Sequence, residues 1–288
     1  MGDARCQVRG GAAAGGGDAG CQVRGGRTLV VEVGYRGGGF SGFAAQPGQR
    51  TVAGELTRAL ETALRRPVDI TCAGRTDAGV HALAQYVSLS LTPEDRDLSP
   101  RRLLASLAAL TPDDISVRRL YLAPCDFSAR FDAVARHYRY RMVPGSARPV
   151  LAWGHAWWMR SVPVLDVAAM DEAARHLVGE HDFRSFCKAL SADKGPTRRL
   201  VANVTVSEVE EAGERLVALD VTGNAFLHNM VRIMAGTLAE VGRGHRDPGW
   251  VREVLAARDR TAAGPTAPPE GLVFAGVDYP AGVLEPWG

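Results

Sequence analysis

The sequence has few lysines, few cysteines and no long apolar run, and the last two shortages each argue against a class of protein. Lys188 and Lys194 are its only lysines, so arginine supplies nearly all of the positive charge. The five cysteines are odd in number and scattered without a Cys-x-x-Cys pair, which argues against a disulfide framework and a zinc site. No apolar run approaches the roughly 20 residues that span a bilayer, and the amino terminus lacks the apolar segment of a signal peptide. These absences predict a cytoplasmic protein without a membrane partner.

The overall charge and composition set only broad bounds. The 288 residues carry 34 basic and 32 acidic side chains, a formal net charge of +2. This excess is too small to identify a nucleic-acid partner, which must be recognised from local clusters instead. With 46% hydrophobic residues, the chain can bury the core of one large domain or two medium ones.

The first 27 residues differ in composition from the rest of the chain. Residues 6–11 (Cys-Gln-Val-Arg-Gly-Gly) recur at residues 21–26, with a run of glycine and alanine between them. Two short copies are too few for a repeat fold, and this composition buries too little apolar surface to order itself. Residues 1–27 are therefore predicted to be a disordered low-complexity tail, or an extension from a misassigned start codon.

From Thr28 onward the chain alternates between strand-like and helix-like segments. Thr51 and Ser99 stand where they can cap helices, and Ser99 precedes a first-turn proline. The breakers Pro144 and Gly145 predict an amino-terminal half at 28–145 and a carboxy-terminal half at 146–288. The mixture predicts an α+β fold, with strands near 29–35, 68–73, 86–91, 115–122, 136–143, 200–208, 215–222 and 272–278, and helices near 51–64, 99–110, 166–177, 231–241 and 248–257.

The most informative stretch is Cys-Ala-Gly-Arg-Thr-Asp-Ala-Gly-Val-His-Ala at residues 72–82. It places Asp77 between two glycines, two residues after Arg75, where a short alternating strand gives way to a tight turn. A carboxylate beside a guanidinium stays ionised near neutral pH, which suits a nucleophile or an electrostatic anchor better than a general acid. The alternative is a structural turn in which Asp77 caps the next element and Arg75 pairs with it.

The contiguous residues 74–82, followed by Gln85, resemble the catalytic signature of the TruA-type tRNA pseudouridine synthases. Matching blocks extend over about residues 28–281. The resemblance implies a pseudouridine synthase fold, in which two similar α/β halves share a largely antiparallel central sheet. It also implies that Asp77 is the catalytic residue and that Arg75, Tyr138 and Arg232 bind the substrate.

The segment from Phe127 to Arg141 resembles the second motif of this family. On a strand, Tyr138 and Tyr140 share one face, while His137, Arg139 and Arg141 share the other. The structural alternative is a half-buried strand with solvated arginines; the functional one is an RNA site with stacking aromatics and guanidinium groups for phosphates. The resemblance implies that Tyr138 stacks on the target uracil, whereas Tyr140 is expected in the core.

The segment 223–232 opens the helix predicted in the carboxy-terminal half. Asn224 can cap this helix, and His228 and Arg232, four residues apart, then share a face. The residues alone are consistent with a helix that has a polar face. The resemblance implies that Arg232 lies against the catalytic carboxylate as an ion pair between the two halves, and it leaves His228 as an RNA contact or a capped polar residue.

Other polar residues carry weaker hypotheses. Arg130, Arg136 and the run Thr-Arg-Arg at 197–199 are candidate phosphate contacts, although such charges are more often solvated. Asp77 and His81 do not predict a metal site, because two ligands without a third at suitable spacing are not enough.

The function implied by the resemblance is isomerisation of uridine to pseudouridine at positions 38, 39 and 40 in the anticodon stem-loop of tRNA, by a homodimer without cofactor. Two departures from the family pattern, Phe43 in place of tryptophan and no asparagine near 106–109, concern packing or RNA contacts more than chemistry. The main alternative is a non-catalytic tRNA-binding or chaperone protein. A nucleotide N-glycosidase is more distant, because it needs a second acid near Asp77.

Overall fold

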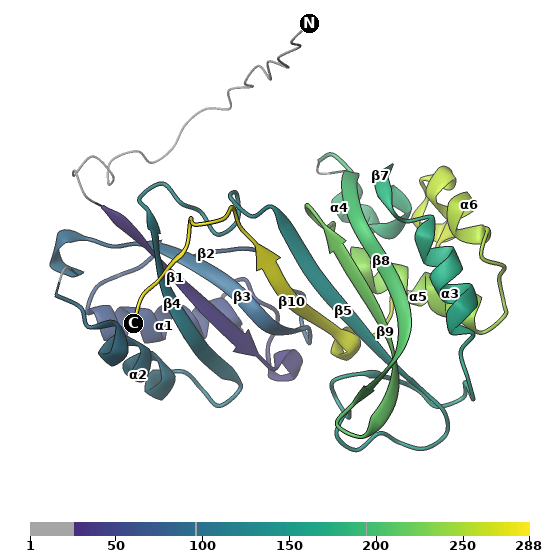
Figure 1. Cartoon of the computed structure of the whole chain (residues 1–288), viewed down its shortest axis with the longest axis horizontal. Helices are drawn as coiled ribbons and strands as arrows, with labels where there is room; N and C mark the ends of the chain where they lie inside the picture. Colours follow the sequence, from purple (N-terminus) through teal and green to yellow (C-terminus); the bar gives the residue numbers. More distant parts are fainter. Residues whose placement is uncertain (1–25, 96, 194) are drawn as a thin grey trace, which may run out of the picture.

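The fold is built on one long, largely antiparallel sheet, which appears in Figure 1 of the computed structural model. The structure describes residues 26–95, 97–193 and 195–288. The predicted tail at 1–27 therefore lies outside the described residues except at its end, where Arg27 begins the first strand. The strands are β1 (Arg27–Tyr35), β2 (Thr71–Cys72), β3 (His81–Ser90), β4 (Ile115–Pro124), β5 (Ala135–Pro144), β6 (Trp157–Met159), β7 (Gly179–Asp182), β8 (Arg198–Glu211), β9 (Glu214–Gly223), β10 (Leu272–Asp278) and β11 (Glu285–Pro286).

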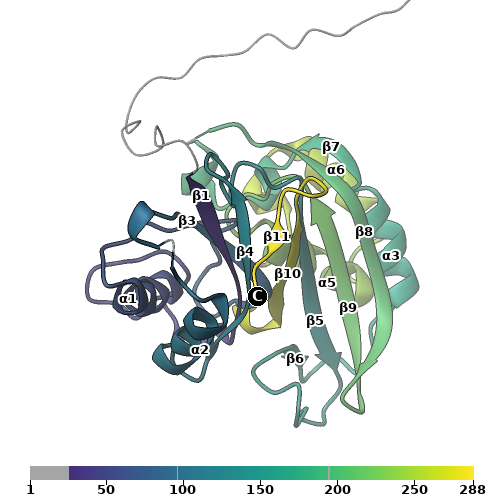
Figure 2. The ribbon, with the colours of Figure 1, turned by 60° about the vertical axis from the view of Figure 1, so that its left-hand side comes forward.

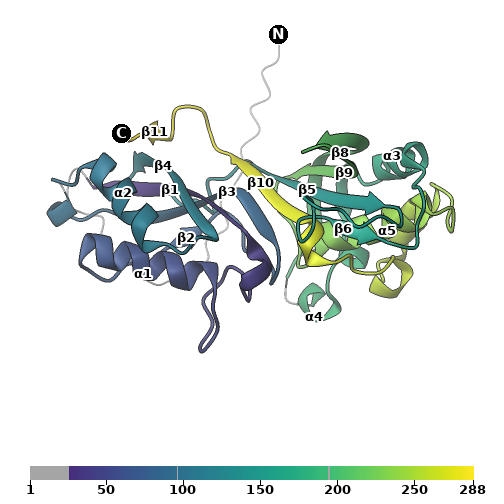
Figure 3. The same cartoon turned by 90° about the horizontal axis from the view of Figure 1, so that it is seen from below.

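The strand order places a late segment of the chain at the centre of the sheet. The order is β11-β4-β1-β3-β10-β5-β9-β8-β7, with β2 paired to β3 and β6 paired to β5. β10 runs parallel to β3 and antiparallel to β5, and Figure 3 shows it between these two strands. In this register Phe274 of β10 pairs with both Ala82 and Tyr138. The sheet is thus continuous from one end of the molecule to the other.

The helices lie in two groups at opposite ends of the sheet. α1 (Val52–Leu64) and α2 (Pro100–Leu110) lie beside the strands β1–β4, whereas α3 (Val167–Arg175), α5 (Met230–Gly242) and α6 (Trp250–Ala257) lie beside β8 and β9 (Figure 2). α4 (Ala189–Ala192) is a single turn. One buried apolar cluster includes residues from both groups, such as Leu56 of α1 and Leu238 of α5. None of the described helices is long and apolar enough to cross a membrane.

Local signals explain most of these elements. The Thr51 hydroxyl accepts a hydrogen bond from Gly54 N at 3.2 Å, and Asp166 likewise accepts from Ala169 N at 2.9 Å, so both helices begin where their caps predict. The Ser99 cap and the proline after it start α2 as predicted. The α+β prediction is confirmed. The strand expected at 68–73 is only two residues long, and β6, β7, α4 and β11 were not anticipated.

The predicted cap of α5 is wrong. Asn224 lies six residues before the helix, where its Oδ1 accepts a hydrogen bond from Leu200 N at 3.1 Å. Its backbone N–H donates to Leu200 O at 3.0 Å, so Asn224 completes the pairing of β8 and β9 instead. α5 starts after Asn229, which has a left-handed backbone with φ of 64° and makes no side-chain cap. His228 therefore stands in the turn before the helix.

The division into halves at about residue 145 stays a prediction. β5 precedes this boundary in the chain, yet in the sheet it lies between β10 and β9, which follow the boundary.

Candidate active site

Asp77 stands in the loop that joins β2 to β3. Thr76, the residue before Asp77, anchors the loop to the protein interior. Its buried hydroxyl lies 2.7 Å from the Tyr35 hydroxyl, and its backbone oxygen accepts a hydrogen bond from Phe43 N at 3.0 Å. Gly79 has a φ of 81°, a conformation that side chains rarely adopt, and this lets the chain turn into β3. The Asp77 side chain is 32% exposed. The carboxylate is therefore held on a fixed loop and still accessible from outside.

Two basic side chains flank the Asp77 carboxylate. His228 Nε2 lies 3.3 Å from one carboxylate oxygen, and Arg232 Nη1 lies 3.8 Å from the other. Arg75 is exposed, and among the described residues no ion pair joins it to Asp77. The structure thus brings Asp77 and Arg232 together. The partner from the structural alternative, Arg75, is replaced by His228 and Arg232.

Arg232 is oriented by contacts on its own side of the site. Its Nε donates a hydrogen bond to Ala267 O at 2.8 Å, and its Nη1 donates to Asn229 Oδ1 at 3.0 Å. Only 16% of the Arg232 side chain is exposed. The side chain is therefore restrained before any substrate arrives, although its distance to Asp77 exceeds a hydrogen-bond length.

His228 has a second contact that sets its orientation. Its Nδ1 lies 3.1 Å from the Ser191 hydroxyl of α4. If the hydroxyl donates to Nδ1, the ring proton is on Nε2 and points toward Asp77. The sequence prediction for His228, an RNA contact or a capped polar residue, included neither its contact with Asp77 nor its contact with Ser191. The sequence carries no signal for these contacts, because the three residues come from distant segments.

Tyr138 of β5 lies close to Gly74, in the loop that leads to Asp77. Its ring packs edge-on against Phe226 and Phe274, at centroid distances of 4.9 and 5.0 Å. A Cβ on Gly74 would lie 3.2 Å from the Phe274 ring and 3.8 Å from the Tyr138 hydroxyl, so this loop passes close to both rings. Burial raises the pKa of the Tyr138 hydroxyl, and the neighbouring Tyr35 and Asp77 raise it further. Tyr138 therefore stays neutral at physiological pH.

The neighbouring residues of β5 divide as the strand alternation predicts. Tyr140 is fully buried, as expected, and donates a hydrogen bond to Pro268 O at 2.8 Å. On the other face Arg139 contacts Asp220 at 2.8 Å and Arg141 contacts Glu211 at 2.8 Å. These arginines are thus paired with carboxylates, a contact that neither alternative included, and phosphate binding by them stays a prediction.

Arg136 is a structural residue and not a phosphate contact. Its Nε and Nη2 donate to Ala73 O at 3.2 Å, its Nη1 donates to Ala133 O and Asn224 O, and its Nη2 also donates to Arg130 O. An arginine has five N–H donors, and these contacts use all of them. Arg136 therefore ties the strand before Asp77 to the loop before β5 and to the end of β9. Among the other candidates, Arg198 pairs with Glu180 at 3.1 Å and Arg199 donates to Pro196 O at 2.9 Å, whereas Arg130 is exposed.

The His81 side chain is buried and engaged in contacts with the protein. Its Nδ1 accepts a hydrogen bond from Gly37 N at 3.0 Å, and its ring lies 4.7 Å from that of His155. Burial lowers the pKa of His81 to about 4, and the nearby His155 and Arg141 lower it further. Within the described ranges no group of three His, Cys, Asp or Glu side chains is arranged to hold a metal ion.

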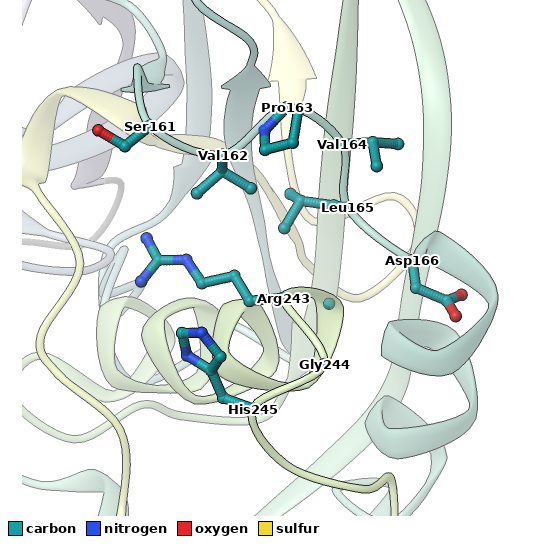
Figure 4. Close-up of a pocket in the computed structure, with 10 residues that line it drawn as sticks. Ser161, Val162, Pro163, Val164, Leu165, Asp166, Arg243, Gly244 and His245 are labelled. Carbon is teal, nitrogen blue, oxygen red and sulfur yellow. The ribbon is translucent and has the colours of Figure 1, made fainter.

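A cavity of about 690 Å³ lies at the opposite end of α5, between Val162–Asp166 and Arg243–His245 (Figure 4). At 1.5 Å per residue, the eleven-residue step from Arg232 to Arg243 places it about 16 Å along the helix from the Asp77 contact. Its Arg243 side chain contacts Glu240 at 2.9 Å. This cavity is therefore separate from the candidate site around Asp77.

Comparison with known proteins identifies the family of the chain. The family profile described as "tRNA pseudouridine synthase" matches residues 173–280. The chain is 42% identical over 252 residues to the tRNA pseudouridine synthase A of Methylococcus capsulatus. The aligned residues cover 88% of this chain and 89% of that relative. The chain is 43% identical over 257 residues to the protein of the same name from Methylobacterium nodulans (89% and 96% covered) and 44% identical over 254 residues to that from Nitrosococcus oceani (88% and 93% covered).

Proposed function

This chain belongs to the tRNA pseudouridine synthase family, and we propose that it isomerises uridines 38, 39 and 40 of the tRNA anticodon stem-loop with Asp77 as its catalytic carboxylate. The observation that carries this proposal is the geometry around Asp77. The carboxylate is 32% exposed, both of its oxygens face basic side chains, and the buried Tyr138 lies close to the loop that leads to it.

The reaction breaks the C1′–N1 and C5–H bonds of uridine and makes the C1′–C5 and N1–H bonds of pseudouridine. The C1′–N1 bond of uridine breaks, the uracil turns in place, C1′ joins C5, and the C5 proton is released while N1 gains a proton. Because nothing is oxidised or reduced, the residues of this chain suffice for the balance. Asp77 either attacks the sugar or the uracil, or stabilises positive charge at C1′. In each case Arg232 and His228 flank the carboxylate and orient it toward the nucleoside.

The substrate-binding residues follow from their positions around this carboxylate. The target uridine must leave its stack to reach Asp77, and Tyr138 is the aromatic residue proposed to hold the flipped base. Arg75 is exposed two residues before Asp77 and is proposed to contact the RNA backbone. Arg232 completes the site from the other side. A homodimer, action without cofactor and a cytoplasmic location are further parts of this proposal.

The test uses unmodified tRNA transcripts labelled with tritium at uracil C5. Wild-type protein should release tritium and form pseudouridine at the anticodon-arm uridines, and Asp77→Ala should bind the tRNA without releasing tritium. Glu208→Ala, which removes an exposed carboxylate on β8, should behave as wild type. Turnover by Asp77→Ala would refute the role of Asp77. Tight tRNA binding by the wild type without release would favour the non-catalytic tRNA-binding alternative, and free uracil in the product would indicate an N-glycosidase.

A further inference from the structure

Phe131 is a large apolar side chain that the fold leaves in solvent. It is 79% exposed, in the loop between β4 and β5. The guanidinium of its neighbour Arg130 lies over the ring, 5.4 Å from the centroid. Burial of a phenylalanine side chain is ordinarily favourable. An exposed ring on a loop with a fixed conformation therefore calls for an explanation.

The loop around Phe131 is held by a set of hydrogen bonds. Asp132 Oδ2 accepts from Ser128 N at 2.7 Å, and Asp132 N donates back to Ser128 O at 3.1 Å. Ala129 is tied on both sides, because its N–H donates to the Ser88 hydroxyl at 3.0 Å and its carbonyl accepts from the Tyr279 hydroxyl at 2.7 Å. The ring is therefore presented by a preorganised turn, and binding to it costs little ordering of the chain.

This turn lies beside the strand that leads to Asp77. The Arg136 guanidinium donates to Arg130 O and to Ala73 O, and Ala73 precedes Asp77 by four residues. Arg75, two residues after Ala73, and Arg130 are both exposed. Phe131 thus stands beside the exposed Arg130, in a loop that Arg136 ties to the chain just before Asp77.

We propose that Phe131 and Arg130 form a stacking platform for an unpaired base of the RNA substrate, next to the uridine that enters the Asp77 site. This inference rests on the proposed function. Removing a uridine from its stack exposes the faces of the neighbouring bases, and an aromatic ring with a guanidinium over it accepts such a face without regard to sequence. The nearby positive charges favour the RNA backbone. A protein partner would need a larger apolar area, and Val134 is the one other exposed large apolar residue of residues 127–135.

The experiment compares three substitutions at one position on a tritium-labelled anticodon stem-loop. Phe131→Ala and Phe131→Leu should weaken stem-loop binding, measured by fluorescence anisotropy, by about tenfold, and raise KM by a similar factor with kcat within about twofold. Phe131→Tyr should stay within about twofold of wild type, since it keeps the ring. Val164→Ala, a 68% exposed apolar residue that lines the cavity at the far end of α5, is the matched control and should change nothing.

The outcomes separate this inference from the proposed function. Unchanged binding in Phe131→Ala, or full rescue by leucine, would overturn the platform. A change of sedimentation mass in Phe131→Ala without a change in RNA affinity would instead identify a protein contact. If wild-type protein binds the stem-loop but releases no tritium, the proposed function fails, and the anisotropy ratio still decides whether Phe131 stacks on RNA.

Discussion

The Nε2 atom of His228 lies 3.3 Å from Oδ1 of Asp77, closer than the 3.8 Å that separates Asp77 from Arg232. Both basic side chains come from the start of α5, one from the turn before it and one from its first turn. A single short segment therefore holds both oxygens of the carboxylate. Its geometry depends on the left-handed Asn229 between them, whose side chain also contacts Arg232.

His228→Ala should lower kcat about tenfold and leave the fold intact. The imidazole restrains one oxygen of Asp77, and its side chain is 39% exposed, so little packing is lost. His228→Gln should retain more activity, because its amide reaches as far as Nε2 and can donate to the same oxygen. Tritium release under single-turnover conditions measures the effect, with a melting curve as control. Full activity of His228→Ala would show that the contact is incidental.

Arg232→Ala should lower kcat by at least tenfold with a small loss of stability. The substitution removes the charge near Asp77 and leaves Ala267 O without its 2.8 Å hydrogen bond, which costs about 1–3 kcal/mol. That cost corresponds to a fall in Tm of a few degrees. Arg232→Lys keeps the charge but cannot make both hydrogen bonds of the guanidinium, to Ala267 O and Asn229 Oδ1. Its activity should therefore lie between those of wild type and Arg232→Ala. Collapse of the fold in the alanine variant would identify Arg232 as structural.

Tyr138→Phe should cost less activity than Tyr138→Ala. The phenylalanine keeps the ring that packs between Phe226 and Phe274, whereas alanine leaves a cavity that costs roughly 3–5 kcal/mol of stability. Kinetics at a temperature where all three proteins are folded separate the two effects. Equal losses of kcat in both variants would assign the role to the hydroxyl and not to stacking.

His81 predicts a specific pH dependence of stability. Its folded pKa of about 4 lies below the ordinary value of 6.5, so the unfolded chain binds the proton more readily between these values. Above pH 6.5 His81 is neutral in both states, whereas uptake of the proton by the unfolded chain removes on the order of 3 kcal/mol of stability as the pH falls toward 4. Burial lowers the pKa of the facing His155 too, which adds in the same direction.

Urea unfolding at several pH values between 4.5 and 7.5 measures this dependence. His81→Asn keeps an acceptor for Gly37 N but does not titrate, so its free energy of unfolding should change less with pH than that of wild type. His245→Asn, at an exposed position just past the carboxyl end of α5, should retain the wild-type slope. Equal slopes for His81→Asn and wild type would exclude His81 as the source.

The elements that sequence predicts well are those with local signals. Thr51, Ser99 and Asp166 cap their helices through hydrogen bonds within three residues, and such contacts can be recognised from spacing alone. β6, β7 and β11 have only two to four residues and exist because a longer partner strand pairs with them. Pairing of that kind is set by tertiary contacts, which periodicity does not report.

The candidate site could be predicted only in part. The motif at residues 74–82 singles out Asp77 as a candidate. The contact between Arg232 and Asp77 is predicted only from the family resemblance, because spacing in the sequence does not report contacts between distant segments. Arg136 illustrates the limit most clearly. In sequence it is one arginine among several beside aromatics, and only the fold shows that five backbone contacts use its donors.

β10 also constrains the order in which the sheet can be assembled. In the described sheet β3 and β5 do not pair with each other, and β10 provides the hydrogen-bonded connection between them. Residues 272–278 are synthesised after both Asp77 and Arg232. The two groups of strands on either side of β10 can therefore be joined into one sheet only after nearly the whole chain has been made.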